Sequence, residues 1–295
     1  MNCNLCPREC NVDRSKSVGF CGAENTLTVS KAYLHNWEEP CISGEKGSGT
    51  VFFSPCNLKC VYCQNYEISH SCKGVKITVD SLSQIFLNLQ EKGAHNINLV
   101  TPTPFADKIA TALRQVKPQL HIPVVYNCSG YERTKTLEDI ADVIDIFIPD
   151  IKFKSPILSK KYLSATDYFE IAIKAIDTMC QITGAPKFDG EIMKKGVIVR
   201  HLVMPTFYKD SIEILRELYE KFGVDKFLLS LMSQYIPCGN LRSFPEINRK
   251  ITTFEYNKVV DFAASCNFNG FTQEKSSATD KYIPIFDNEG VNFDE

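Results

Sequence analysis

Three cysteines lie close together in one short segment of the chain, which reads CNLKCVYCQN. They are Cys56, Cys60 and Cys63, so their spacing is Cys-x3-Cys-x2-Cys. Three thiolates in one loop can bind three irons of a four-iron, four-sulfur cubane and leave the fourth iron without a protein ligand. An open coordination position is typical of a catalytic metal centre, because structural sites are closed. The trio therefore predicts a reactive iron–sulfur cluster.

S-adenosylmethionine can fill such an open position through its amino and carboxylate groups, which places its sulfonium beside the cluster. One electron from the reduced cluster then cleaves a carbon–sulfur bond. The alternative is a zinc site or three unrelated buried cysteines. Zinc sites usually need four ligands and pair Cys-x2-Cys with a distant second pair. Here the trio follows a β-rich run, with an aromatic residue, Tyr62, before the last cysteine, which favours the cluster.

A second group of cysteines stands near the start of the chain: Cys3, Cys6, Cys10 and Cys21, spaced x2, x3 and x10. Four thiolates close together make a full tetrahedral set, which suits a structural zinc or a second, fully ligated iron–sulfur cluster. The spacing does not separate these two metals. The alternative, four free thiols in a flexible arm, is disfavoured because so few large apolar residues would have difficulty ordering the segment without metal.

The overall charge and the cysteine count limit the class of protein. The 295 residues include 33 basic and 35 acidic side chains and no long basic run, so nucleic acid is not an expected partner. There is no apolar stretch of about 18 residues to span a membrane and no signal-peptide pattern, so we expect a cytoplasmic protein without a membrane partner. Thirteen cysteines, an odd number, favour metal-binding thiolates over disulfides in a reducing compartment.

From about residue 50 onward, short β-rich runs alternate with helical patterns, which is typical of parallel βα units. Six strands are predicted: Thr50 to Ser54, Ile97 to Thr101, Pro123 to Asn127, Val143 to Pro149, Gly196 to Met204 and Phe227 to Ser233. Six units predict an α/β fold with a partial (β/α)6 TIM-type barrel. We expect a Cys-rich metal-binding cap over residues 1–49, the barrel core over 50–272 and an irregular tail over 273–295.

A polar segment follows each predicted strand or lies late in it. After the cysteine loop, these are Thr101 to Pro104, Asn127 to Gly130, Asp150 to Lys152, Arg200 with His201, and Ser233 to Tyr235. In parallel α/β folds the C-terminal ends of the strands carry the active site. We therefore expect the six segments to face one cavity.

The Cys-x3-Cys-x2-Cys loop resembles that of the radical S-adenosylmethionine superfamily. Within this superfamily, the chain is similar to pyruvate formate-lyase activating enzyme-like proteins of the PflX type. The likeness extends over nearly the whole chain, through CNLCPREC, EEPCISG, GSGTVFFSPCNLKCVYCQNYEIS, VVYNCSGYE, PDIKF, VRHLVMP and LMSQYIP. Such a run of segments in order is highly specific for the superfamily and much less specific for the reaction.

The resemblance implies roles for residues at the strand ends. Tyr62 is expected to lie against the adenine of S-adenosylmethionine, and Asn127 and Ser129 are expected to meet the ribose or the carboxylate. Asp150 and Lys152 match the Asp-Leu-Lys motif of glycyl-radical activating enzymes, where the pair helps to hold the methionyl carboxylate directly or through a cation. The alternatives are an aspartate that caps the following turn and a solvated lysine.

Two further positions follow from the same comparison. The segment at Val100 to Pro104 takes the place of a Gly-Gly-Glu motif that binds the amino group of S-adenosylmethionine, and its hydroxyls come from Thr101 and Thr103. Arg200 and His201 are adjacent in a strand, so only one of them can face the cavity. We expect Arg200 there as a carboxylate or ribose partner, because a guanidinium forks onto such groups, and His201 in the core.

A segment with His35, Trp37, Glu38, Glu39 and Cys41 joins the N-terminal cysteines to the first predicted strand. If the cap covers the mouth of the barrel, Cys41 or a carboxylate reaches the substrate, with Cys41 as a catalytic hydrogen donor to a product radical. The alternative is that Cys41 is a small buried residue, since cysteine often behaves as a small hydrophobe.

These features predict an enzyme whose cofactors are a 4Fe–4S cluster and S-adenosylmethionine. The expected product of cofactor cleavage is a 5′-deoxyadenosyl radical that abstracts hydrogen from a substrate, with a low-potential electron donor such as flavodoxin or ferredoxin. The family likeness makes a glycyl-radical protein one candidate substrate, and a small molecule or peptide is the alternative. A non-catalytic iron–sulfur or zinc redox sensor is a second hypothesis, but such a protein needs no polar residues at all six strand ends.

Overall fold

The computed structural model describes residues 2–239, 241–274, 277–279 and 284–291. Its centre is a sheet in which six strands run parallel in the order β2 (Ser48–Phe53), β4 (Ile97–Val100), β5 (Val124–Cys128), β6 (Ile146–Pro149), β8 (Ile192–Leu202) and β9 (Leu228–Met232). All six predicted strands are therefore present. Each differs from its predicted bounds by a few residues.

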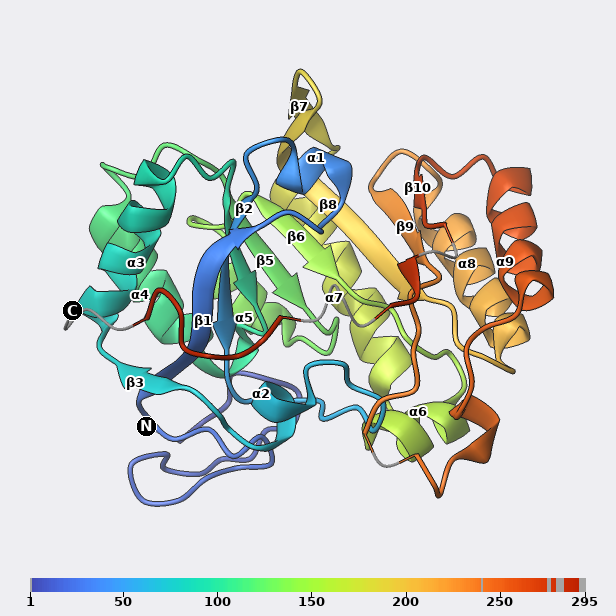
Figure 1. Cartoon of the computed structure of the whole chain (residues 1–295), viewed down its shortest axis with the longest axis horizontal. Helices are drawn as coiled ribbons and strands as arrows, with labels where there is room; N and C mark the ends of the chain where they lie inside the picture. Colours follow the sequence, from blue (N-terminus) through green and yellow to red (C-terminus); the bar gives the residue numbers. More distant parts are fainter. Residues whose placement is uncertain (1, 240, 275–276, 280–283, 292–295) are drawn as a thin grey trace.

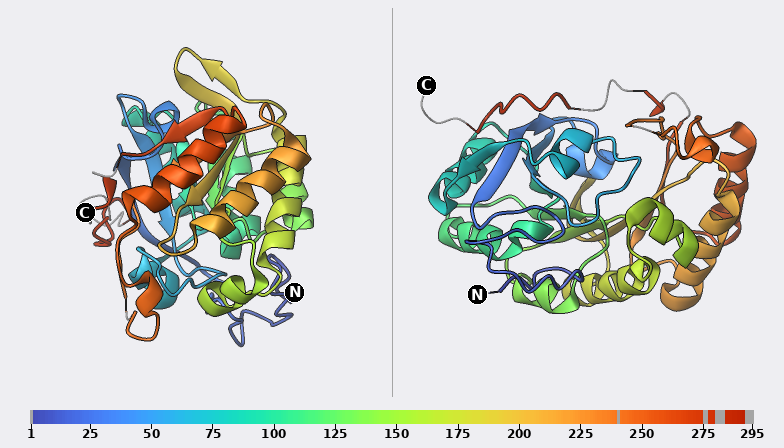
Figure 2. Two further views of the ribbon diagram at one scale, coloured as in Figure 1. Left: turned by 90° about the vertical axis from the view of Figure 1, so that its right-hand side faces the viewer. Right: turned by 90° about the horizontal axis from the view of Figure 1, so that it is seen from below.

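One main helix follows each parallel strand, and these helices cover the outer face of the curved sheet (Figures 1 and 2). They are α3 (Val79–Glu91), α4 (Ala106–Val116), α5 (Thr134–Asp139), α7 (Tyr168–Thr183), α8 (Tyr208–Phe222) and α9 (Thr253–Ser265). The main hydrophobic core lies between these helices and the sheet. The predicted α/β architecture of six βα units is confirmed. Within the described residues the sheet is open, because its path ends at β10 (Gly270–Thr272) and β3 (Val75–Ile77).

Short elements lie at the two ends of the parallel strands. Figure 1 shows α2 (Tyr66–His70) and α6 (Pro156–Leu163) at the end where the strands finish. At the opposite end lie α1 (Pro40–Ser43) and the hairpin of β7 (Lys187–Asp189) with the start of β8. The strand-end segments and the cysteine loop thus share one edge of the sheet, and α1 lies near the other.

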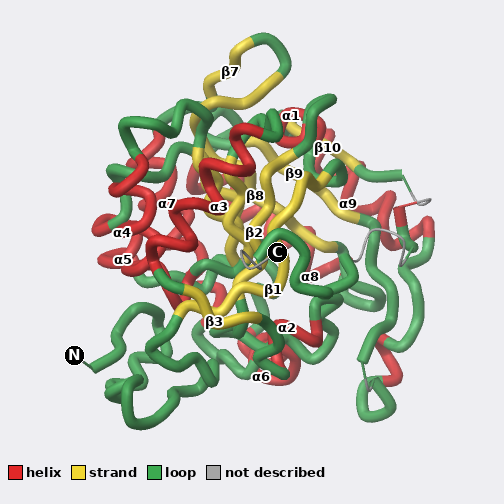
Figure 3. The backbone as a smooth tube through the Cα atoms, turned by 60° about the vertical axis from the view of Figure 1, so that its left-hand side comes forward, coloured by secondary structure: helices red, strands yellow, loops and turns green. Residues whose placement is uncertain are grey.

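Strand β1 (Leu27–His35) was not predicted. It pairs antiparallel with β2 and β3 within the region expected to be a cap, whereas residues 3–25 contain neither a helix nor a strand longer than a bridge (Figure 3). One reason is Lys31, which is only 6% exposed in the middle of the strand. Its ammonium is neutralised by Asp287 at 2.9 Å and Glu289 at 2.8 Å. Because these partners lie so far along the chain, the sequence around Lys31 does not show that its charge is neutralised in a strand.

The C-terminal segment over residues 284–291 packs along β1. The Ala32 amide donates to the Glu289 carbonyl at 2.8 Å, and the Asn288 amide donates to the Ser30 carbonyl at 3.1 Å. Phe286 is buried, and its ring meets that of Phe52 edge-on, with 5.4 Å between the centroids. Positions 275–276, 280–283 and 292–295 of the expected tail lie outside the described residues.

Among all the residues that the structure describes, no helix has both the length and the apolar character to cross a bilayer.

Replacing Phe286 with alanine should loosen the C-terminal segment from β1, because the deleted ring fills a buried contact with Phe52. A buried Phe→Ala change costs about 3 kcal/mol or more. The measurement is limited proteolysis, read by mass spectrometry for cleavage between residues 284 and 291. Ile285→Ala is the matched control, since its side chain is 78% exposed. Equal cleavage rates in both variants would contradict the packing.

Candidate active site

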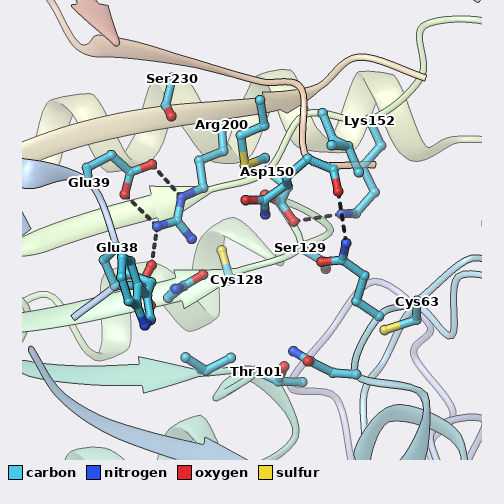
Figure 4. Close-up of a pocket in the computed structure, with 18 of the residues that line it drawn as sticks. Glu38, Glu39, Cys63, Thr101, Cys128, Ser129, Asp150, Lys152, Arg200 and Ser230 are labelled. Atoms are coloured by element: carbon cyan, nitrogen blue, oxygen red, sulfur yellow. Dashed lines mark hydrogen bonds and ion pairs between the residues drawn. The ribbon is translucent and has the colours of Figure 1, made fainter. Parts of the chain in front are cut away.

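A cavity of about 770 Å³ opens where the parallel strands end (Figure 4). Its volume lies within the range of ~300–1,000 Å³ that is usual for ligand pockets. All six strand-end segments contribute to its wall, as expected. The expected site residues among its lining are Cys56, Cys60, Tyr62, Cys63, Thr101, Thr103, Asn127, Ser129, Asp150, Lys152 and Arg200.

The backbone of the cysteine loop is held in place by hydrogen bonds from distant parts of the chain. The Asn57 side chain donates to the Tyr131 carbonyl at 2.9 Å, and the Val61 amide donates to the Tyr162 carbonyl at 3.0 Å. At the start of the loop, the Leu58 amide donates to the Cys56 sulfur at 3.4 Å. These contacts turn the three thiols, all of which are free, toward the cavity.

The environment of the three thiols fits a cluster that brings positive charge. Burial raises the pKa of Cys56, Cys60 and Cys63, and the Lys152 ammonium opposes this increase. Iron supplies the further positive charge that the thiolate form needs. Across the described residues, no three Cys, His, Asp or Glu side chains gather around a point where one ion could sit.

Asp150 and Lys152 form an ion pair of 2.6 Å at the end of β6. Burial lowers the pKa of Lys152, but Asp150 together with Cys60 and Tyr168 outweighs burial, so the pKa is raised and the lysine stays charged. The Tyr168 hydroxyl donates to the carbonyls of Ser129, at 2.8 Å, and Asp150, at 3.0 Å. Gly130 has a φ of 76°, and a Cβ there would lie 2.1 Å from the Asp150 carbonyl oxygen. The ends of β5 and β6 are therefore locked together.

Tyr62 forms an aromatic wall of the cavity. Its side chain is 6% exposed and meets three rings edge-on, those of Phe153, Tyr162 and Tyr235, with centroid distances of 6.1, 6.5 and 6.1 Å. Such packing fixes the plane of the ring, which can then stack against a flat ligand group.

The segment after β4 carries backbone strain and a buried carboxyl group. Thr101 has a φ of 61°, which is unusual for a β-branched residue and is typical of functional sites. The Thr103 hydroxyl donates to Glu132 at 2.7 Å, and Tyr126 donates to the other carboxylate oxygen at 3.3 Å. Burial raises the pKa of Glu132 to about 8. No role was predicted for Glu132, because nothing in its local sequence separates it from a surface glutamate.

Arg200 faces the cavity and His201 does not, as the alternation of strand side chains predicts. His201 is 1% exposed, and its Nδ1 lies 2.7 Å from the Ile151 carbonyl oxygen. Burial lowers its pKa to about 4, so the ring is neutral. The guanidinium of Arg200 contacts two carboxylates, Glu38 and Glu39, which the prediction of a cofactor contact did not include.

Cys41 does not line the cavity within the described part of the chain. It is 5% exposed and packs in an apolar cluster with Ile42, Ile146 and Ile198. Burial raises the pKa of its thiol to about 12. This placement favours the alternative of a small buried residue over a catalytic hydrogen donor.

The four N-terminal cysteines are brought together. Cys3, Cys6, Cys10 and Cys21 line one small cavity and are free thiols. The lobe that carries them contacts the cysteine loop, because Arg8 donates to the Asn57 carbonyl at 3.1 Å. The described residues do not place these four thiols around a single ion position, so a metal in this lobe stays a prediction.

The fold and the cavity together define an α/β protein with a thiol-lined site at its strand ends. A family model described as the Radical SAM superfamily matches residues 50–220, which is more than half of the chain. The chain therefore belongs to the radical S-adenosylmethionine superfamily. Membership implies a 4Fe–4S cluster and S-adenosylmethionine as cofactors, and the residues around the three thiols fit them.

The chain is also similar to individual known proteins. The uncharacterized protein MJ0674 of Methanocaldococcus jannaschii is 28% identical over 279 residues, which cover 91% of this chain and 76% of that protein. SuiB of Streptococcus suis, solved with bound S-adenosylmethionine, aligns with a TM-score of 0.50 and 14% identity over 74% of this chain and 48% of its own. The FeFe-hydrogenase maturase HydG of Carboxydothermus hydrogenoformans aligns with a TM-score of 0.51 and 16% identity, over 75% of this chain and 52% of HydG.

The chain thus spans about half the length of SuiB and HydG. Identities this low show a shared fold alone.

Replacing Glu132 with glutamine should remove a pH dependence of stability. The folded-state pKa of about 8 exceeds the ordinary value of 4.5, so between these values the folded state holds a proton that the unfolded state has released. The contribution of Glu132 to the free energy of unfolding is fully present below pH 4.5 and is lost as pH rises through 8. At pH 8 the free energy of unfolding of the variant should exceed that of wild type by a few kcal/mol, since each pKa unit corresponds to about 1.4 kcal/mol. At pH 5 the two free energies of unfolding should be similar.

The measurement is urea unfolding of both proteins at several pH values under the same metal loading. Glu138→Gln, at an exposed position in α5, is the control and should leave the pH profile unchanged. Parallel profiles for wild type and Glu132→Gln would show that Glu132 is ionised in the folded protein.

Proposed function

We propose that this chain cleaves S-adenosylmethionine reductively at a 4Fe–4S cluster held by Cys56, Cys60 and Cys63. The resulting 5′-deoxyadenosyl radical abstracts hydrogen from a substrate bound in the same cavity. The observation that carries the proposal is that three free thiols and polar groups from all six strand ends line one cavity in a member of this superfamily.

The lining residues suit the parts of the cofactor. The charged Lys152 offers N–H donors to the methionyl carboxylate, with Asp150 fixing its position. The Thr103 hydroxyl donates a hydrogen bond to Glu132, so its lone pairs remain as acceptors for the amino group. The wall made by Tyr62 suits the adenine. These roles are proposals for this chain.

Asn127 and Ser129 lie on the lining beside these groups and are proposed partners of the ribose or the carboxylate. The guanidinium of Arg200 has a single nitrogen, Nη1, without a partner among the described residues. A cofactor contact at Arg200 would be made through that nitrogen.

The cluster, when bound, supplies the electron for cleavage, and the protein around it keeps water away. Buried aromatic residues surround the cysteine loop, among them Tyr62, Phe153 and Tyr162. On the open side of the sheet, Phe271 and Pro284 contribute to the lining. A reactive radical needs such exclusion, because side reactions with solvent compete with hydrogen abstraction.

The proposed electron donor is a low-potential protein such as flavodoxin or ferredoxin. The proposed substrates are a glycyl-radical protein, as in activating enzymes of the PflX-like type, or a small molecule or peptide. The charged floor of the cavity, formed by Arg200 with Glu38 and Glu39, supports the second class, because a glycine residue has no side chain to meet these charges.

We also propose a metal in the N-terminal lobe, bound by Cys3, Cys6, Cys10 and Cys21. Their position around one small cavity supports it. The lobe lies against the cysteine loop through the bond from Arg8 to Asn57. A zinc ion there would order the lobe, whereas an iron–sulfur cluster would in addition stand beside the catalytic loop as an electron entry point.

The combined substitution of Cys56, Cys60 and Cys63 by alanine should abolish cofactor cleavage. Anaerobically purified wild type, reduced with dithionite and given S-adenosylmethionine, should form 5′-deoxyadenosine, and the triple variant should fall to background because the cluster has no ligands. Chromatographic quantification of 5′-deoxyadenosine is the measurement. Cys266→Ala, at a half-buried position beyond α9, is the control. A brown wild-type protein that makes no 5′-deoxyadenosine would instead support the redox sensor.

Metal analysis of the same triple variant should identify the N-terminal metal. Zinc without iron indicates a structural zinc, and residual iron with matching sulfide indicates a second cluster. Adding Cys3→Ser and Cys6→Ser should remove about one equivalent of zinc, or all of the residual iron and sulfide, and expose residues 2–26 to protease, because the metal orders the lobe. A triple variant that holds neither iron nor zinc would exclude the N-terminal site.

A further inference from the structure

Arg8 joins three parts of the chain that are far apart in the sequence. Its Nε donates to the Asn57 carbonyl at 3.1 Å, Nη1 to the Ser164 carbonyl at 2.5 Å and Nη2 to the Leu163 carbonyl at 3.2 Å. Asn57 belongs to the cysteine loop, and Leu163 and Ser164 lie at the end of α6. A guanidinium presents its donors in a fixed planar fork, so the three carbonyls are held in one geometry.

The end of α6 also binds the middle of the cysteine loop. The Val61 amide donates to the Tyr162 carbonyl at 3.0 Å, directly before the two carbonyls that Arg8 binds. Arg8 ties Asn57 to this turn, and Val61 bonds to it without an intermediary. The stretch between these two anchors is therefore fixed to one place at both ends, and it contains the proposed cluster ligand Cys60.

The stretch between the anchors is strained. Lys59 has a φ of 56°, in the left-handed region that residues other than glycine rarely adopt. Such a conformation persists only where the surrounding structure holds it. The bonds at Asn57 and Val61 provide this support on either side of Lys59, so the loss of one of them should let the loop relax.

Arg8 is also part of the N-terminal lobe, which Figure 1 shows at the end of the sheet where the parallel strands finish. It lies between two of the proposed metal ligands, Cys6 and Cys10. The Glu9 amide donates to the Cys6 carbonyl at 3.1 Å, which closes a tight turn around Arg8. The guanidinium lies 3.8 Å from the centre of the Phe20 ring. A metal bound by these cysteines would fix the turn from which Arg8 reaches the cysteine loop.

We infer that Arg8 is a positioning residue of the catalytic site, which holds the cysteine loop in the shape that receives the cluster. It also connects the two groups of cysteines, because order in the N-terminal lobe reaches the loop through its side chain. The inference rests on the proposed function, since the cluster at Cys56, Cys60 and Cys63 belongs to that proposal. The lobe is then part of the cluster site and not a separate metal-binding module.

Hydrogen–deuterium exchange of the full-length protein tests this clamp. In Arg8→Gln the amides of residues 56–63 should exchange about tenfold faster than in wild type, since a charged hydrogen bond to the loop is lost. Arg8→Lys keeps the charge but not the fork, so exchange should stay close to that of Arg8→Gln. Arg133→Gln is the matched control, because Arg133 contacts the lobe at the Asn4 carbonyl and at Glu9. It should leave exchange in the cysteine loop unchanged.

Phe20→Ala is a second variant that should leave the fold intact, because this ring is 39% exposed. It frees one side of the Arg8 guanidinium, so the loop amides should again exchange faster than in wild type, by a smaller factor than in Arg8→Gln. Exchange at the wild-type rate in both Arg8→Gln and Phe20→Ala would overturn the inference. Full recovery in Arg8→Lys would overturn it as well, since charge alone would then account for the effect.

Electron paramagnetic resonance of the reduced, cluster-loaded protein extends the test to the cluster. The signal that changes when S-adenosylmethionine is added belongs to the cluster with the open iron. In Arg8→Gln this signal should change shape and its midpoint potential should shift, because the potential depends on the surroundings of the sulfurs. A residue that only stabilises the fold would lower the amplitude of the signal and leave its shape and potential as in wild type.

The connection between the two cysteine groups has its own test. The variant with Cys3→Ser and Cys6→Ser should shift the midpoint potential in the same direction as Arg8→Gln. Adding Arg8→Gln to that variant should give no further shift, because both changes act through one contact. Additive shifts would overturn the role of Arg8 as the connection.

Formation of 5′-deoxyadenosine by wild type is measured in parallel. If it is formed while loop exchange in Arg8→Gln equals that of wild type, the proposed function stands and the clamp is wrong. If it is not formed while loop exchange rises in Arg8→Gln and not in Arg133→Gln, the clamp stands and the proposed function fails.

Discussion

Hydrogen bonds between the last residues of neighbouring parallel strands hold the cavity together. The Thr101 amide donates to the Asn127 carbonyl at 3.0 Å, the Asp150 amide to the Cys128 carbonyl at 2.9 Å, and the Ile151 amide to the Arg200 carbonyl at 2.8 Å. These three bonds fix the ends of β4, β5, β6 and β8 to one another in series. The charged and polar side chains that follow the strands are therefore held at set distances from one another, although they come from segments far apart in the sequence.

Burial is the second physical condition of the site. It raises the pKa of the cluster thiols and of Glu132. At Lys152 the effect of burial is outweighed, because Asp150 and other negative groups lie close. The cavity and the residues packed behind it therefore hold two kinds of ionisable group. Some are kept neutral by the absence of water, and others are kept charged by a partner at contact distance.

The sequence predicts the six parallel strands and the cysteine loop because both leave local patterns. Periodic hydrophobic runs specify the strands, and close cysteine spacing specifies the loop. Strand β1, the contact of Lys31 with the C-terminal segment and the three charges around Arg200 have no such pattern. The partners of Arg200 precede it by more than 160 positions, so only the folded chain shows that they meet.

Cys41 illustrates a second limit. It lies two positions after Glu39, and the sequence alone does not show which of the two faces the cavity. The single turn of α1 begins at Pro40, and it directs Cys41 into the apolar cluster while Glu39 reaches Arg200. The start of α1 at Pro40 therefore separates the carboxylate that reaches the cavity from the thiol that is buried beside it.

The contacts of the cysteine loop also affect how the protein matures in the cell. Asn57 donates to Tyr131, which lies 74 positions later, and the Val61 amide donates to Tyr162, about 100 positions later. A ribosome that has released the three cysteines has not yet made these anchors. Iron that arrives during synthesis meets thiols on a loose chain, whereas iron that arrives after the fourth βα unit has folded meets a shaped receptor. The shaped receptor for the cluster is therefore complete only once the chain through Tyr162 has folded.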